Sequence, residues 1–220
     1  MSSAFCPECA ETLLVARSPR CPRCATTYDS GGVDRYCGTC LLDTPPFESA
    51  VAPFLYGGAM AAAISRLKYS GATWIAAPLG NLLAGVELAS RPTVIVPVPL
   101  HPRRVVERGF NQATLLAGPL ARRHTVPLDT SALARVEDTA PQARQARAER
   151  LHALRGAFAV RKPGRIEGAR VLLVDDVVTT TATIRAASTA LLGGGASSVS
   201  VVALARAEWS ERVARRGQTG

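Results

Sequence analysis

The chain has 220 residues, of which 47% are hydrophobic and 20% charged, a composition that supports one sizeable packed core and argues against disorder throughout. Its opening residues lack a basic stretch followed by an apolar one, and no window reaches about 18 uninterrupted apolar residues. We therefore expect a cytoplasmic protein with no membrane insertion. The formal net charge of +9 favours partners that carry phosphate, either a small molecule or a nucleic acid backbone.

Residues 1–47 form a cysteine-rich segment with little apolar periodicity, whereas residues 48–220 carry the apolar runs of a larger domain. Grouped cysteines in a cytosolic chain indicate metal ligation in place of disulfides. Two CxxC pairs supply the four thiolates of a tetrahedral site, so we expect structural zinc in this segment. The segment holds three such pairs, Cys6/Cys9, Cys21/Cys24 and Cys37/Cys40. One of the three is therefore not needed for the site.

Apolar positions at helical spacing predict two helices after the cysteine-rich segment, over residues 60–69 and 74–88. Gly71 separates them. Lys68 and Tyr69, at the end of the first helix, are interpreted as part of its solvated face.

The remainder of the chain alternates between strand and helix patterns. The predicted order is strand 93–98, helix 111–123, strand 171–174, helix 183–192 and strand 199–204. Near-continuous apolar strands separated by helices indicate an α/β fold with a parallel sheet covered on both faces. Residues 139–165 are very basic and are predicted to be loosely structured, which in a compact domain is typical of a functional loop.

Residues 171–183, VLLVDDVVTTTAT, carry the most specific chemistry. A buried strand that ends in adjacent carboxylates, followed by a hydroxyl-rich turn and a helix, lies where an open α/β sheet binds its ligand. Asp175 and Asp176 are suited to accept hydrogen bonds from vicinal ribose hydroxyls and to reach Mg²⁺. Amides and hydroxyls at the start of the helix would cradle a phosphate. They belong to Thr179, Thr180, Thr181, Ala182 and Thr183.

This run resembles the phosphoribosyl diphosphate (PRPP) signature of type I phosphoribosyltransferases. Together with residues 64–71 (ISRLKYSG), 96–112 (VPVPLHPRRVVERGFNQ) and 139–158, it resembles the ComF family of competence-associated proteins over nearly the whole chain. The resemblance implies a parallel sheet of the type I phosphoribosyltransferase kind with a small N-terminal zinc ribbon. It also implies a PRPP site in which the acidic pair holds the ribose and the threonine-rich loop holds the 5-phosphate.

Other parts of the site follow from the same resemblance. The turn at residues 99–104 would hold pyrophosphate, with Arg103 and Arg104 as its cationic ends. Asn111 and Gln112 would either line the pocket or cap and pack the next helix. The basic residues 139–158 resemble a hood that closes over PRPP in related enzymes. Its expected contacts are Gln142, Arg147 and Arg150.

The family pattern also selects among the cysteine pairs. In the family, the pair just before the PPF stretch at residues 45–47 closes the zinc ribbon with the pair preceding it. This implies that the ligands are Cys21, Cys24, Cys37 and Cys40. In the alternative arrangement, Cys6 and Cys9 join Cys21 and Cys24.

One departure from the family pattern concerns the phosphate turn. The family usually has glycine where this chain has Thr181, so a β-branched residue stands where a positive φ is expected, and the turn would be strained. No catalytic residue is assigned, because positioning and Mg²⁺ supply much of what phosphoribosyl transfer requires. We expect a PRPP-binding protein linked to DNA uptake in natural transformation. The alternative is a competence factor without catalysis that handles single-stranded DNA, with other competence proteins as partners.

Overall fold

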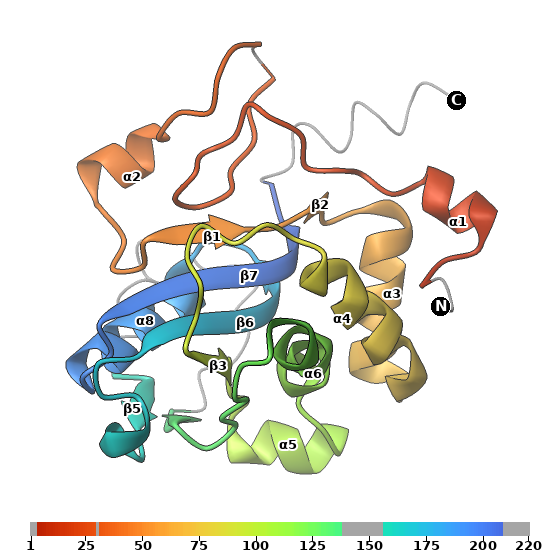
Figure 1. The fold of residues 1–220 in the computed structure, drawn as a ribbon. Coiled ribbons are helices and arrows are strands. Elements are labelled where there is room, and N and C mark those ends of the chain that lie inside the picture. The colour runs from red at the N-terminus through yellow and green to blue at the C-terminus, as the bar shows by residue number, and fades with distance from the viewer. Residues whose placement is uncertain (1–3, 30, 138–155, 209–220) are drawn as a thin grey trace.

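The structure, a computed structural model, describes residues 4–29, 31–137 and 156–208. Its central sheet consists of the strands β1 Ser49–Val51, β2 Phe54–Leu55, β3 Val94–Pro97, β6 Arg170–Val178 and β7 Ser198–Arg206. Every pairing in this sheet is parallel. β6 and β7 lie in the middle, β3 flanks β6, and β1 and β2 pair successively with the other edge of β7 (Figure 1).

Helices cover both faces of the sheet, as Figure 1 shows. The helices are α1 Pro7–Glu11, α2 Gly38–Leu42, α3 Gly58–Tyr69, α4 Ala76–Ala84, α5 Pro102–Arg108, α6 Gln112–His124 and α8 Ala182–Gly193. α3, α4 and α6 pack on one face around a core of apolar side chains. α8 packs on the other face, together with the antiparallel pair β4 Leu133–Arg135 and β5 Phe158–Val160. This is the α/β architecture with a parallel sheet that the sequence predicts.

The predicted elements agree with α3, α6, α8, β3 and β7 to within two residues at each end. The helix predicted over residues 74–88 begins as a 3₁₀ turn, η1 Thr73–Ile75, and α4 ends at Ala84, because Gly85 follows and glycine disfavours helix continuation. The stretch at residues 139–165 contains a strand, β5, because its apolar residues pair with β4. In the described part of the chain, none of the helices has the length and apolar character needed to cross a bilayer.

β6 differs most from its prediction. The strand was expected to end at Val174, but it continues to Val178 because β7 extends alongside it, with Asp175 opposite Ala203 and Val178 opposite Arg206. β3 stops earlier, with Pro97 opposite Val174. The two carboxylates therefore lie inside β6, at the point where one of its two neighbours ends.

The cysteine-rich segment divides between two parts of the molecule. Residues 17–29 and 31–44, here called the cysteine module, contain α2 and lie above β1 and β7 in the view of Figure 1. Thr26 of the module accepts a hydrogen bond from Arg206 at the end of β7. Residues 4–16 belong with the larger domain, because Phe5 and Leu13 pack against the core under α3 and the amide of Leu55 donates to the carbonyl of Leu14 at 2.7 Å. Hydrophobic packing thus places this first segment against the larger domain, while the boundary at residue 47 stays a prediction.

Candidate functional site

The two aspartates of β6 face opposite sides of the sheet. Side chains alternate along a strand, so Asp175 continues the row of Leu173 toward α8, and Asp176 continues the row of Val174 toward α3. Asp176 meets Lys68 of α3 on its side. The carboxylates therefore lie at one sheet edge without forming a single bidentate group.

Lys68 binds Asp176 in a largely buried ion pair. Its Nζ donates to Asp176 Oδ1 at 2.8 Å, and the two side chains are 21% and 5% exposed. Although burial by itself lowers the pKa of Lys68, the charge of Asp176 raises it above its usual value overall. The prediction of a solvated face is wrong for Lys68, because the helix end points at the sheet, whereas Tyr69 is exposed and lies under the guanidinium of Arg108.

The second oxygen of Asp176 lacks a hydrogen-bond donor among the described residues. This atom, Oδ2, is buried. A buried carboxylate oxygen without a donor is unfavourable, and a ligand hydroxyl or a cation would satisfy it.

Asp175 has a strongly perturbed carboxyl group. Its Oδ1 accepts a hydrogen bond from the amide of Asp176 at 2.8 Å. Burial, followed by the negative charge of Asp176, raises the pKa of Asp175 to about 7. Lys68 and Arg135 oppose this shift through their positive charges. The group therefore changes charge near neutral pH, where a nearby cation would favour the ionised form.

The threonine turn, residues 179–181 between β6 and α8, has the positive φ that the family pattern implies. Thr181 caps α8 with φ +67° and ψ −5°, in the left-handed region where a β-branched residue is strained. The predicted strain is thus confirmed at this residue. Its side chain makes no capping hydrogen bond. The first amides of α8, which by helix geometry have no acceptor within the helix, therefore suit an anion.

A cavity of about 780 Å³ opens in front of this turn. That volume lies in the range of small-molecule sites. Its lining combines Thr179, Thr180 and Thr181 with residues of the cysteine module, while Asp175 and Asp176 are not among the lining residues. The remaining lining residues are Cys24, Thr26, Thr27, Tyr28, Cys37, Thr39, Cys40, Arg185, Arg206, Ala207 and Glu208.

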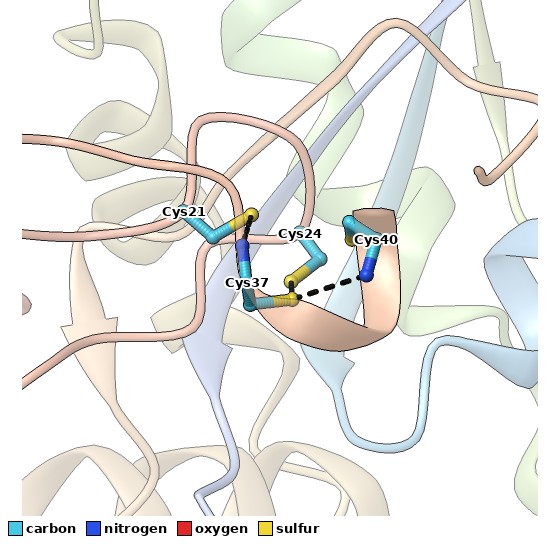
Figure 2. A group of neighbouring side chains, drawn as sticks. All are labelled: Cys21, Cys24, Cys37 and Cys40. Carbon is cyan, nitrogen blue, oxygen red and sulfur yellow. Dashed lines mark hydrogen bonds between the residues drawn. The ribbon is translucent and has the colours of Figure 1, made fainter. Parts of the chain in front are cut away.

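Four cysteine sulfurs of the module gather in one place (Figure 2). The Sγ atoms of Cys21, Cys24, Cys37 and Cys40 all lie within 4.8 Å of one another. A tetrahedral zinc with Zn–S bonds of about 2.3 Å places its sulfurs about 3.8 Å apart, so the cluster fits that ion with small adjustments. The amide of Cys37 donates to Cys21 Sγ and the amide of Cys40 to Cys37 Sγ, each at 3.4 Å. Such bonds stabilise thiolate charge.

The other cysteine pair lies elsewhere. Cys6 caps α1 and Cys9 belongs to it, and both are exposed. Because residues 4–16 pack with the larger domain, the structure does not bring this pair to the cluster formed by the other four cysteines.

Comparison with known proteins decides the family. The family described as Phosphoribosyl transferase domain matches residues 111–217. The chain is 35% identical to the DNA utilization protein YhgH of Salmonella typhi, covering 92% of this chain and 90% of that protein. It is 32% identical to Competence protein F of Haemophilus influenzae, with 92% and 96% covered, and 31% identical to Competence protein ComFC of Bacillus subtilis, with 78% and 71% covered.

The chain belongs to the ComF family. Among solved structures, it aligns with a glutamine PRPP amidotransferase from B. subtilis at a TM-score of 0.40 and 24% identity, over 58% of this chain and 25% of that one. That similarity is too low to add to the assignment.

The basic residues that the ComF family pattern assigns to pyrophosphate lie on a helix. Residues 102–104 start α5 instead of forming a turn, because Pro102 occupies a first helical position behind the capping residue His101. Arg103 and Arg104 are both bound to Glu107, at 3.2 and 3.0 Å. A pyrophosphate would have to compete with that carboxylate. Gln142, Arg147 and Arg150 of the predicted hood lie outside the described residues.

Asn111 and Gln112 have structural partners. Asn111 caps α6, accepting from the amide of Ala113 at 2.9 Å and donating to the carbonyl of Val98 at 3.0 Å. Gln112 is buried and accepts from Arg108 at 2.7 Å. The structure thus favours capping and packing over lining the pocket.

Sequence reasoning missed Arg185 and Arg206, which both line the cavity. Arg206 ends β7 and lies 27 residues from Thr179, whose carbonyl it binds. An isolated arginine after an apolar strand gives no local signal of such a role.

Proposed function

We propose that this ComF-family protein binds PRPP with Mg²⁺ and acts in the uptake or use of DNA. The observation that carries this proposal is the threonine turn at the start of α8, which lines a cavity of suitable size and is separated from Asp175 and Asp176 by only two residues of β6. The 5-phosphate would lie against the amides of residues 181–183. The names of the relatives, a DNA utilization protein and competence proteins, support the biological role.

The two aspartates have the chemistry that a ribose and a cation require. Asp176 Oδ2 lacks a donor among the described residues and would accept from a ribose hydroxyl. Asp175 has a pKa raised to about 7, so part of it is protonated at neutral pH, and it would lose that proton when Mg²⁺ binds. When bound, Mg²⁺ would neutralise the pyrophosphate charge. Positioning and charge stabilisation of this kind also support phosphoribosyl transfer without a dedicated base.

Calorimetric titration with PRPP and Mg²⁺ tests the site. Wild-type protein should bind, and Asp175→Asn and Asp176→Asn should each weaken binding about tenfold or more, because each removes a charge-assisted interaction. Glu87→Gln, which removes an exposed carboxylate outside the site, is the control and should bind like wild type. Equal affinity in all four proteins would disprove this placement of PRPP.

A second function, handling of single-stranded DNA without catalysis, is favoured by the charge of the chain. The net charge is +9, and residues 101–165 hold thirteen Arg and Lys against five Asp and Glu. Binding of an oligonucleotide that weakens steeply with salt and ignores Asp175→Asn and Asp176→Asn would support this alternative. Binding that requires both aspartates would argue against it.

We further propose that the cysteine module holds structural zinc through Cys21, Cys24, Cys37 and Cys40. Each must lose a proton, and burial raises the pKa of Cys40 to about 12, so zinc affinity should rise with pH. Elemental analysis should find one zinc per chain in wild type and in Cys6→Ser/Cys9→Ser. Loss of zinc from that double variant, with retention in Cys40→Ser, would reverse the assignment.

A further inference from the structure

A single hydroxyl connects a candidate zinc ligand to the phosphate turn. Thr26 Oγ1 lies 3.2 Å from Cys24 Sγ and 3.1 Å from Arg206 Nη2. Because a guanidinium only donates, the hydroxyl accepts from Arg206 and has its own proton available for the sulfur of Cys24. A thiolate bound to a metal is a better acceptor for that proton than a thiol.

Arg206, which binds Thr26, also binds the backbone at the start of the threonine turn. It is only 8% exposed, and its Nη1 donates to the carbonyl of Val178 at 2.9 Å and also to the carbonyl of Thr179. These carbonyls belong to the last residue of β6 and the first residue of the threonine turn. The guanidinium therefore fixes the backbone that leads into the proposed phosphate site.

A second contact holds the other end of the same turn. Arg185 lies in the first turn of α8, and its Nη1 lies 3.0 Å from Asp43 Oδ2, while its side chain is 13% exposed. Asp43 caps the end of α2, three residues after Cys40. The cysteine module thus reaches the start of the threonine turn through Arg206 and contacts Arg185, after the turn, directly. Both connections begin in segments adjacent to clustered cysteines, Cys24 and Cys40.

We propose that the metal-loaded cysteine module is the outer wall of the phosphate site, and that Thr26 and Arg206 couple metal binding to sugar-phosphate binding. This inference rests on the proposed binding of PRPP and zinc. Metal fixes Cys24 and Cys40 in one geometry, and through them the segments that hold Arg206 and Arg185. Amides that must converge on a phosphate lose affinity when their support loosens. By linkage, PRPP must then tighten zinc binding by the same factor.

The experiment measures both sides of this linkage on the full chain. Calorimetry with PRPP and Mg²⁺ should show binding about tenfold tighter in the zinc-loaded than in the zinc-free protein. Competition with a chelator should show zinc held more tightly, by the same factor, when PRPP is present. The chelator measurement starts from zinc-loaded protein, so it decides the question even if the zinc-free module unfolds.

Two matched variants locate the coupling. Thr26→Val removes the hydroxyl between Cys24 and Arg206 while preserving the shape of the side chain, and the coupling factor should fall toward one. Thr44→Val removes a hydroxyl of the same module that donates to the carbonyl of Cys40 and reaches no arginine in the described contacts, so it should keep the wild-type factor. Arg206 is here a positioning residue, and zinc retention is a readout that a purely local role in PRPP binding would leave unchanged.

The outcomes separate this inference from the proposed function. PRPP that binds zinc-loaded and zinc-free protein equally, and leaves zinc retention unchanged, would overturn the coupling while PRPP binding itself stands. Full coupling in Thr26→Val would overturn the assigned route. Absence of PRPP binding to zinc-loaded wild type would overturn the proposed function and this inference together.

Discussion

The ammonium of Lys68, at the end of α3, binds the carboxylate of Asp176 near the carboxyl end of β6, although 108 residues separate them in the chain. The pair joins a helix to the sheet edge where the ligand is proposed to bind. It uses one oxygen of Asp176 and leaves the other without a donor among the described residues. Lys68 thereby determines where the carboxylate points.

Replacement of Lys68 tests the strength of this pair. Lys68→Met should lower the free energy of unfolding by about 3 kcal/mol, because it leaves the charge of Asp176 buried without a partner. Lys162→Met, at the other lysine of the chain and exposed, should change it by less than about 0.5 kcal/mol. Denaturant unfolding measures both. Adding Asp176→Asn to Lys68→Met should recover part of the loss, and a purely additive result would show that the pair is not coupled.

Thr181→Gly tests the strain in the phosphate turn. Glycine adopts φ +67° without the clash of a β-branched side chain, so the substitution should raise the free energy of unfolding by about 1 kcal/mol. The Thr181 side chain makes no capping bond that would be lost. Thr179→Gly, in the same turn with no positive φ, should lower stability instead. Thermal or denaturant unfolding of the two variants measures the difference, and a loss at both positions would show that Thr181 is not strained.

The carboxyl of Asp175 should make stability fall as pH rises. Its pKa is 3.8 in the reference state and about 7 in the folded chain, so between these values the folded protein keeps a proton that the unfolded chain releases. The free energy of unfolding should therefore decrease as pH rises through this window. Asp175→Asn should remove that decrease, which denaturant titrations of both proteins across the window would show. Parallel pH profiles would contradict the raised pKa.

Asp34 and Asp129 act in the opposite direction and remain in both proteins of that comparison. The amide of Arg20 is the main cause of the lowered pKa of Asp34, and although burial raises the pKa of Asp129, hydrogen bonds from Ser131 lower it overall. Both carboxylates stabilise the folded chain above the pKa that they have in the unfolded chain, and this stabilisation is lost as the pH falls. The difference between wild type and Asp175→Asn therefore isolates Asp175.

Local patterns in the sequence predicted the elements that position the site. Apolar runs predicted the strands, and apolar residues at helical spacing predicted α3, α6 and α8. Burial of one face of a helix or of a strand between helices requires apolar residues at the period of that element. The end of β6 was missed because it depends on the length of β7 beside it. The partners of Arg103 and Arg104 were missed because Pro102 starts a helix that brings both arginines to Glu107.

The sequence by itself determined the fold class and the family, and it predicted which residues would hold a sugar phosphate and a metal, since residue types at short spacing report their chemistry directly. Only the tertiary structure decided that Lys68 binds Asp176, and that the cysteine module faces the threonine turn through Thr26 and Arg206, 180 residues apart. Such contacts depend on how the cysteine module and the helices pack on the sheet. That packing is a property of the whole core and leaves no periodic trace in the chain.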